Sequence, residues 1–432
     1  MLNISYLKQY FVFFGNKFKF NSLLPVLTFL FYFSIIASVI GTGMLNITII
    51  FFNIIFIFFL FSNKDKIEFH FNKIIFFLTI AFLLLNIFSS IESDRSFYGT
   101  LNLLKNLVFL IGGYTIFKLN KNVFKNFISL TLIIFLLVGL DTLLQYFLGK
   151  DIFGYVYSQT HGGRLSGPFG DEWIVGSFLS KILFLSIIYF LYNYERKFYD
   201  IIFLFISITI IFLTNERSAI IMTLFSSFIY LFFRFKNLKV KVIFFSSLIL
   251  ITIFFSSIPS IKNQLIIKSL EQIGLKDSSW NSDDQIFLDS QWGAHYLTAI
   301  SIFKNNPIFG SGLKTFRYEC QNEEYNNINS KSSNARCSSH PHNFYLEILS
   351  DTGIIGLGLF IYLLFWVFLN IIRAILDNEK NAYITLVIFF LFFWPIKTTG
   401  SIFASWNSYF YILALLAIIT QLNLIKININ DK

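Results

Sequence analysis

Long runs of apolar residues recur along most of the chain, and no other feature constrains its fold as strongly. A run of about 18 or more apolar residues can cross the roughly 30 Å hydrocarbon core of a membrane as an α-helix. Because lipid offers no hydrogen-bond partners to the backbone, such runs must be helical. Twelve runs are found, at approximately 22–40, 44–62, 74–92, 100–117, 124–147, 173–192, 199–214, 216–233, 240–257, 353–376, 381–398 and 402–424. The sequence therefore predicts an all-α polytopic membrane protein with about twelve transmembrane helices.

Lysine and arginine gather before the first run and then in every second loop between the runs. This basic set consists of Lys8, Lys17, Lys19, Lys64, Lys66, Lys73, Lys118, Lys121, Lys125, Arg196, Lys197, Arg234, Lys236, Lys239, Lys241, Arg373 and Lys380. The intervening short loops carry only Arg95, Lys150, Arg164, Arg217 and Lys397. By the positive-inside rule we expect both termini in the cytoplasm. The net charge of +10 is therefore a topology signal, and we expect no nucleic-acid partner.

One polar segment, from about residue 258 to 352, interrupts the apolar pattern. The expected topology places it outside the cytoplasm, and a loop of this length is uncommon unless it is functional or disordered. Within it, residues 289–303 have the pattern of an amphipathic helix that stops at Asn305-Asn306-Pro307. We therefore expect helices one to nine in 1–257, a large extracytoplasmic helical loop in 258–352 and helices ten to twelve in 353–432.

The two cysteines of the chain, Cys320 and Cys337, both lie in this loop. In an oxidising compartment they could form a disulfide that closes a loop of about 17 residues and is worth roughly 3 kcal/mol. A zinc site made by the two cysteines with His340 and His342 is the alternative. Their spacing matches no common zinc template, so the disulfide is favoured.

His342 and Asn343 stand where the polar loop meets the tenth apolar run. Histidine is the side chain whose unperturbed pKa lies near neutrality, so it can exchange a proton at physiological pH. A purely structural alternative exists, in which His342 is an interfacial residue and Asn343 caps the next helix. Gly353 and Gly356, further on, could likewise only allow close helix packing.

Several short blocks occur in a fixed order along the chain. His342-Asn343 is followed by nine residues and by Gly353-Ile-Ile-Gly356. The other blocks are Asp141-Thr-Leu-Leu-Gln145, Gly163-Arg-Leu-Ser-Gly-Pro-Phe-Gly-Asp-Glu172, Thr214-Asn-Glu-Arg217-Ser and Asn306-Pro-Ile-Phe-Gly310-Ser-Gly312 followed by Phe316-Arg317. In these blocks the chain, from about residue 130 to 400, resembles the O-antigen ligase and O-antigen polymerase superfamily of membrane glycosyltransferases. The resemblance also implies a GT-C-like fold with the large loop between the ninth and tenth helices.

The resemblance implies a reaction at the periplasmic face of the bacterial inner membrane. A glycan carried on undecaprenyl diphosphate would move to an acceptor hydroxyl, on a lipid A core or another surface acceptor. The expected partners are thus the lipid-linked donor, the acceptor and membrane lipid. No cofactor is expected, and the sequence shows no phosphate-binding loop, His-Glu-x-x-His, Cys-x-x-Cys or Asp-x-Asp pattern for metal or nucleotide chemistry.

The chemistry of this reaction indicates which side chains to consider. A diphosphate leaving group needs fixed positive charge, and guanidinium groups bind phosphate oxygens in pairs. Arg164 and Arg217 are therefore catalytic candidates, and Arg317 is a candidate for substrate binding. A neutral imidazole suits the orientation and deprotonation of the acceptor hydroxyl, so His342 is the candidate base.

Each arginine also has a structural interpretation. Arg217 could extend to the membrane interface, Arg164 could be a solvated loop charge, and Arg317 could pair with Glu319 or Glu323.

Other polar residues near these blocks are weaker candidates. Asn343, His340 and Glu172 are assigned to substrate binding, although nothing separates His340 or His295 from surface histidines. Gly353, Gly356, Cys320 and Cys337 are assigned structural roles. Charged side chains inside spans are expensive, and Lys105 and Lys181 are interpreted as groups that pack and register helices. Asp141, Gln145, Asp171 and Glu172 receive the same interpretation, and Glu172 is also an alternative proton acceptor.

Three functions remain open at the level of the sequence. The complete histidine pattern favours a ligase over a polymerase, which would use a second lipid-linked glycan as the acceptor. A lipid or polysaccharide transporter is less favoured, because no pair of broken helices or inverted repeats is evident.

Overall fold

The computed structural model describes residues 20–63, 67–70, 73–157, 162–194, 198–272, 287–398, 400–424 and 426–429. Within these ranges every predicted apolar run overlaps a helix. The helices are α2 (Phe20–Ile40), α3 (Thr42–Ser62), α4 (Lys73–Ser89), α5 (Ser93–Leu119), α6 (Lys121–Leu148), α7 (Val175–Asn193), α8 (Tyr199–Leu213), α9 (Arg217–Arg234), α10 (Leu238–Ser256), α15 (Phe344–Leu376), α16 (Tyr383–Phe393) and α17 (Ser405–Leu422).

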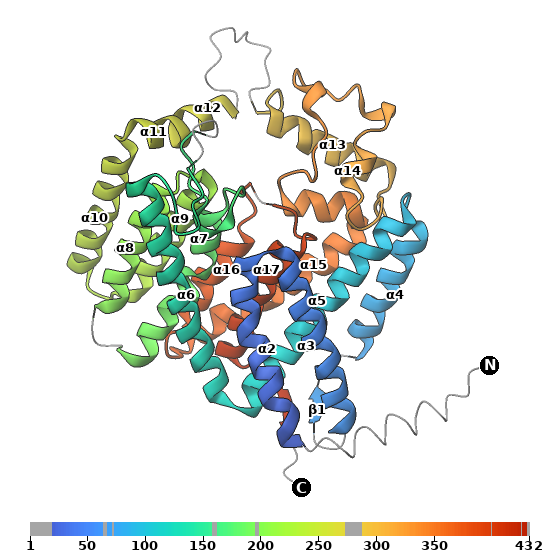
Figure 1. The fold of residues 1–432 in the computed structure, drawn as a ribbon. Helices are drawn as coiled ribbons and strands as arrows, with labels where there is room; N and C mark the ends of the chain where they lie inside the picture. Colours follow the sequence, from blue (N-terminus) through green and yellow to red (C-terminus); the bar gives the residue numbers. More distant parts are fainter. Residues whose placement is uncertain are drawn as a thin grey trace.

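Helix length and composition confirm a multi-pass membrane protein of the all-α class. Among the described residues, nine helices are long and apolar enough to cross a membrane. Three shorter apolar helices complete the predicted twelve: Thr79–Ser89, Tyr199–Leu213 and Tyr383–Phe393. A small antiparallel sheet of β1 (Ile67–His70) and β2 (Lys426–Ile429) lies at the end of the bundle opposite α13 and α14 (Figure 1).

The orientation of the bundle was predicted partly from residues that lie outside the described ranges. These are Lys8, Lys17, Lys19, Lys64, Lys66, Arg196 and Lys197. The placement of the two ends of the chain in the cytoplasm therefore stays a prediction.

The polar segment between α10 and α15 contains short helices at one end of the bundle (Figure 1). They are α11 (Pro259–Lys262), η2 (Asn263–Ile267), α12 (Lys268–Gln272), α13 (Gln291–Asn305), α14 (Phe316–Glu319), η3 (Glu323–Tyr325) and η4 (Ser333–Ala335). The amphipathic helix predicted at 289–303 is α13. It begins where Ser290 Oγ accepts a hydrogen bond from Gly293 N at 3.1 Å, and it ends just before Pro307.

Helix α16 is shorter than the predicted run at 381–398. It ends at Phe393, two residues before Pro395, because the residue that precedes a proline is disfavoured in helical conformation. Its 11 residues rise only about 16 Å, roughly half the thickness of the hydrocarbon core. Residues 394–398 and 400–404, called the segment 394–404 below, lie between α16 and α17 and are non-helical. Non-helical backbone at membrane depth is tolerated only where protein or a water-filled cavity surrounds it.

Helix α15 begins at Phe344, nine residues before the predicted start of the tenth span, and breaks at Gly353. Gly353 has a φ of 64° and a ψ of −166°, a conformation that strongly favours glycine. The segment 307–312 fills the break. Ile354 N donates to Pro307 O at 2.9 Å, and Ser311 N donates to Ser350 O at 2.9 Å.

Glycines allow these two backbones to approach. A Cβ at Gly353 would collide with the Ile308 carbonyl, and a Cβ at Gly310 would collide with the backbone of Asp351. Gly356 faces Phe82 of α4, where a Cβ would lie 3.0 Å from the ring. The two glycine-containing blocks of the sequence are therefore the two sides of one close backbone contact.

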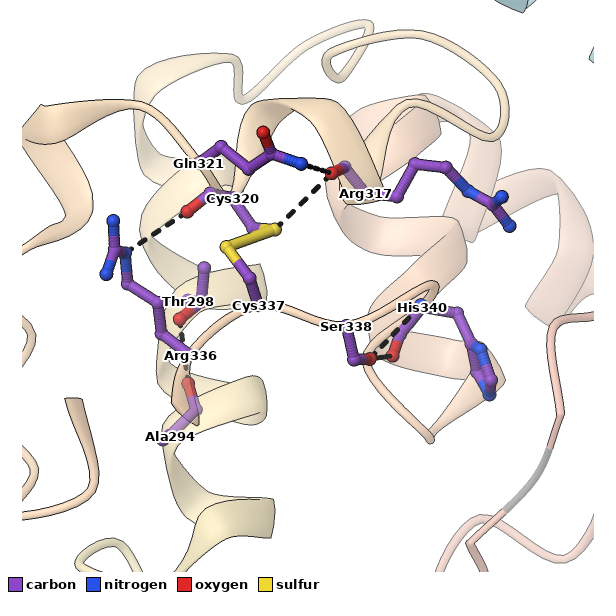
Figure 2. Close-up of a disulfide and its surroundings, with 9 residues drawn as sticks. All are labelled: Ala294, Thr298, Arg317, Cys320, Gln321, Arg336, Cys337, Ser338 and His340. Carbon is purple, nitrogen blue, oxygen red and sulfur yellow. Dashed lines mark hydrogen bonds between the residues drawn. A yellow bond between two sulfur atoms is a disulfide. The ribbon is translucent and has the colours of Figure 1, made fainter. Parts of the chain in front are cut away.

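A disulfide joins Cys320 to Cys337, with the Cα atoms 5.3 Å apart (Figure 2). It closes a loop, residues 321–336, that follows α14 and is called the hairpin below. Arg336 Nε also joins the two ends of this loop by donating a hydrogen bond to Cys320 O at 3.2 Å. Because the two sulfur atoms are bonded to each other, the structure agrees with the predicted disulfide and not with the alternative zinc site.

We expect the disulfide to stabilise the hairpin 321–336 locally. Replacing both cysteines by alanine removes a loop-closure contribution of about 3 kcal/mol, so opening should become about a hundredfold more frequent. Hydrogen exchange monitored by mass spectrometry should show faster exchange of the hairpin amides, while amides in the middle of α7 keep their protection. Unchanged exchange in the hairpin would contradict the assigned closure.

Candidate active site

A cavity of about 500 Å³ lies at the end of the bundle that carries the polar loop. It is bounded by the loop before α7, the turn between α8 and α9, α13, the chain just before α15 and the segment 394–404. Its lining residues are Arg164, Glu172, Ile174, Ser177, Ser180, Lys181, Glu216, Ser218, Ala219, Met222, Trp292, His340, His342, Leu391, Phe392, Lys397, Thr398, Gly400, Trp406, Asn407 and Tyr411.

The loop that carries Arg164 is held in place by Gln145 of α6. Gln145 Oε1 accepts hydrogen bonds from Ser166 N at 3.0 Å and Gly167 N at 2.8 Å, and its Nε2 donates to Ser166 Oγ at 3.1 Å. Asn215, in the turn between α8 and α9, donates to Gly162 O at 2.7 Å. The buried amide of Gln145 thus fixes the backbone of the loop that carries Arg164, about 20 residues later in the chain.

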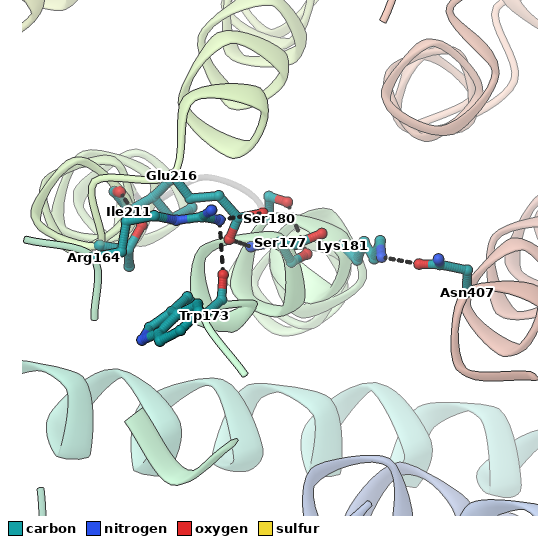
Figure 3. Close-up of polar contacts among 9 residues, drawn as sticks. Arg164, Trp173, Ser177, Ser180, Lys181, Ile211, Glu216 and Asn407 are labelled. Atoms are coloured by element: carbon teal, nitrogen blue, oxygen red, sulfur yellow. Dashed lines mark hydrogen bonds and ion pairs between the residues drawn. The ribbon is translucent and has the colours of Figure 1, made fainter. Parts of the chain in front are cut away.

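Arg164 projects from this loop into the cavity beside a carboxylate. Its Nη2 donates to Trp173 O at 2.8 Å and lies 3.9 Å from Glu216 Oε1 (Figure 3). Glu216 Oε2 in turn accepts a hydrogen bond from Ser177 N at the start of α7 at 2.8 Å. The arginine side chain is 32% exposed and its Nε has no hydrogen-bond partner, so the guanidinium keeps capacity for a ligand.

Two lysines contribute to the same cavity, and neither was among the residues predicted for the site. Lys181 Nζ donates to Asn407 Oδ1 at 2.9 Å and lies 4.2 Å from the centre of the Trp406 ring. Lys397 Nζ donates to Leu391 O at 2.8 Å. The sequence did carry a signal, since Lys181 interrupts an apolar run, but its interpretation as a packing group missed the cavity. Sequence alone could not show that Lys397, 216 positions later, faces the same space.

His342 lies at the other side of the cavity, in a backbone conformation that few residues other than glycine adopt. Its φ is 59°, and such strained residues cluster at functional sites. The centre of its ring is 4.4 Å from that of Trp292 and 4.3 Å from that of His340. The described residues offer the imidazole these ring contacts and no hydrogen bond, so both nitrogens remain available.

Burial gives His342 an unusual protonation state. Removal of water, followed by repulsion from His340 and His295, lowers the pKa of His342 from 6.5 to about 3. The imidazole of the empty site is therefore neutral at physiological pH. A neutral ring can accept a hydrogen bond from a hydroxyl group, which a protonated ring cannot do.

Asn343 begins α15 and connects it to the segment 394–404. Its Oδ1 accepts hydrogen bonds from Tyr345 N at 2.9 Å and Leu346 N at 3.2 Å, while its Nδ2 donates to Pro395 O at 2.9 Å. One turn later Glu347 accepts hydrogen bonds from Ser401 Oγ and from Ile402 N. The side chain of Asn343 is thus engaged in a cap and a cross-link, and it does not line the cavity. These contacts hold the residue next to His342 against the chain at Pro395.

The remaining predicted site residues divide into two groups. Glu172 and His340 line the cavity. Arg217, the first residue of α9, is outside the lining but close enough to Arg164 to interact with its charge. Arg317 lies in α14 above the disulfide (Figure 2), outside the lining, and its charge acts on Lys314 and Glu347.

Four long helices begin at the cavity. Lining residues lie within the first turns or at the N-terminal flank of α7, α9, α15 and α17. Each helix N-terminus carries roughly half a positive elementary charge. Together with three basic side chains, against two carboxylates, these helix ends make the cavity suited to an anionic ligand.

A comparison with protein families agrees with the motifs that build this cavity. Residues 202–361 match the family model described as O-antigen ligase. The match confirms the resemblance to the O-antigen ligase and polymerase superfamily, a family of glycosyltransferase-like membrane enzymes that use a lipid-linked glycan and an acceptor. No curated protein matches the chain.

The matched residues 202–361 include only part of the cavity lining. Glu216, His342 and the residues around the Gly353 break fall within the matched residues 202–361. Arg164, Lys181 and Lys397 fall outside them. The cavity is therefore completed by parts of the chain on both sides of the matched residues.

The protonation state of His342 gives a testable pH dependence. Because burial depresses its pKa to about 3, the ring of the empty protein should stay neutral from pH 5 to pH 8. NMR spectra of protein labelled in its histidine rings, with His342→Gln used for assignment, should show no titration of this residue near pH 6.5. The unfolded chain does bind a proton there, so this site should lower stability as the pH falls below 6.5. A His342 midpoint near 6.5 would contradict the burial argument.

Proposed function

We propose that the protein is an O-antigen ligase-like glycosyltransferase that moves a glycan from undecaprenyl diphosphate to an acceptor hydroxyl. The acceptor would be a lipid A core or another surface acceptor, and the reaction would take place at the periplasmic face of the bacterial inner membrane with both termini of the chain in the cytoplasm. One observation carries the proposal. A neutral imidazole and a cluster of cations share one cavity at the membrane end that bears the polar loop.

One side of the cavity would bind the donor and the other side would bind the acceptor. On one side, Arg164 holds the diphosphate of the donor, with Arg217 adding positive charge from just outside the lining. On the other side, His342 accepts a hydrogen bond from the acceptor hydroxyl. As the acceptor oxygen bonds to the anomeric carbon, the bond from that carbon to the diphosphate oxygen breaks. The electron pair leaves with the diphosphate and the proton passes to His342.

The low pKa of His342 fits this order of events. In the empty site the ring is a weak base that mainly positions a hydroxyl group. A diphosphate bound nearby brings negative charge, which favours the protonated imidazole and raises its pKa. The base would therefore become competent when the donor is present, which limits unproductive proton uptake by the empty enzyme.

The acceptor distinguishes a ligase from a polymerase. The complete pattern from His342 to Gly356 supports the ligase assignment, and a polymerase would instead add the glycan to a second lipid-linked glycan. Purified protein supplied with a defined undecaprenyl diphosphate glycan and with both kinds of acceptor separates these functions by the product that forms. Movement of the lipid-linked glycan across a vesicle membrane without any transfer would support the transporter alternative and overturn our proposal.

Substitution of His342 should stop transfer while leaving the donor site intact. His342→Ala is expected to lower the rate at least about a hundredfold, since a positioned base typically contributes that much or more. His342→Gln keeps a hydrogen-bonding group and should recover only part of the positioning effect. The measurement is the transfer rate of purified variants, with insertion into the membrane and donor affinity as controls. Full activity of His342→Ala would refute its role.

Substitution of the arginines should weaken the donor site. Arg164→Ala is expected to raise the donor concentration needed for half-maximal rate by tenfold or more, as a charged hydrogen bond is worth about 1.5–3 kcal/mol. Arg217→Ala should have a similar but smaller effect, because its charge acts from outside the lining. Lysine at either position should restore function only partly, since it lacks the paired donors. The exposed Arg95→Ala serves as the matched control. Equal kinetics for all three alanine variants would argue against the assignment.

A further inference from the structure

Lys181 and Lys397 approach each other from elements far apart in the chain. Lys181 belongs to α7, and Lys397 belongs to the non-helical segment that follows α16. Both line the cavity, and the charge of Lys181 acts on Lys397. Packing that brings two cations together within a membrane protein is unfavourable unless something compensates for their repulsion.

Neither lysine has a carboxylate within ion-pair distance among the described residues. Two ion pairs among the described residues join Arg164 to Glu216 and Arg234 to Asp200, and neither includes Lys181 or Lys397. Figure 3 shows Glu216 beside Arg164, where its carboxylate contacts the guanidinium and Ser177 N. The charge of Glu216 also acts on Lys181, but its direct contacts are with Arg164 and Ser177 N.

The structural contacts of the two lysines leave much of their hydrogen-bonding capacity unused. Each ammonium has three N–H donors. Lys181 uses one on Asn407 and rests on the Trp406 ring, while Lys397 uses one on Leu391 O at the end of α16. A lysine that served only to cap or to link helices would not need to face the cavity, whereas both of these do.

We propose that Lys181 and Lys397 form a second anion subsite of the cavity, which binds phosphate or carboxylate oxygens of the substrate. This subsite is separate from the Arg164 and Glu216 pair and rests on the proposed function, which it deepens. An anion placed between the ammonium groups replaces their repulsion by two attractions.

Two parts of the substrate carry such oxygens. The diphosphate of the carrier would span from Arg164 towards the lysines, or an acidic sugar of the glycan would place its carboxylate there. Both sources offer the same chemistry to the lysines, so binding experiments with separate ligands must distinguish them.

The test uses the full-length protein in detergent with two pairs of probes. Undecaprenyl diphosphate without a glycan is compared with undecaprenol, and a soluble uronate oligosaccharide is compared with its methyl ester. Lys181→Met, Lys397→Met and the double variant keep side-chain length and remove charge. We expect each single variant to lose about ten- to a hundredfold in affinity for one of the two anionic probes. The two neutral probes should be unaffected, and arginine at either position should restore part of the loss.

Controls separate this inference from loss of fold and from the proposed function. Lys262→Met, an exposed lysine of α11 outside the lining, should bind like the wild type, and thermal unfolding of each variant reports folding. Loss of undecaprenyl diphosphate binding assigns the subsite to the carrier, and loss of uronate binding assigns it to the glycan. Folded lysine variants that bind both anionic probes like the wild type overturn the subsite, even if the wild-type protein transfers glycan. Absence of transfer by the wild type instead overturns the proposed function.

Discussion

The constraint on which the rest of this structure depends is the need to pair backbone groups that leave a helix at membrane depth. Lipid cannot satisfy them, so every break in a span must be covered by protein or by an aqueous cavity. At Gly353 the segment 307–312 provides the partners of the broken α15. Beyond Phe393 the first turns of α15 do so through Asn343 and Glu347. Both breaks are therefore covered by protein, and the cavity lies beside the second one.

This arrangement places cationic side chains and a neutral imidazole in one cavity. Cations need an anion or water nearby, and a base must avoid protonation before its substrate arrives. Burial against Trp292 and two further histidines keeps His342 neutral, while the helix N-termini and Arg164 attract negative charge on the other side. A diphosphate would connect the two regions, because it neutralises the cations and strengthens the base.

Much of the fold was predictable because it depends on local properties. Apolar length located every span, although α16 ended early at Pro395 and α15 began before its predicted start. The sequence showed Gln145 as a polar residue within an apolar run, but it could not show that this side chain contacts the loop that carries Arg164. Lys181 gave a visible signal, and it does link helices as expected, through Asn407 of α17, but the sequence could not show that it also faces a cavity. Asn343 caps α15, as its structural interpretation expected, and its cross-link to Pro395 O could not be read from the sequence.

By itself the sequence determined that this chain is a multi-pass membrane protein, where its apolar helices lie, and which short blocks accompany its polar loop. Hydrophobicity and backbone preference act over a few turns, so they can be read from neighbouring residues. Only the tertiary structure decided that Arg164, Lys181, His342 and Lys397 meet in one cavity while Arg217 and Arg317 stay outside its lining. That choice depends on how helices distant in the chain pack and on which breaks they cover, and no local pattern encodes such contacts.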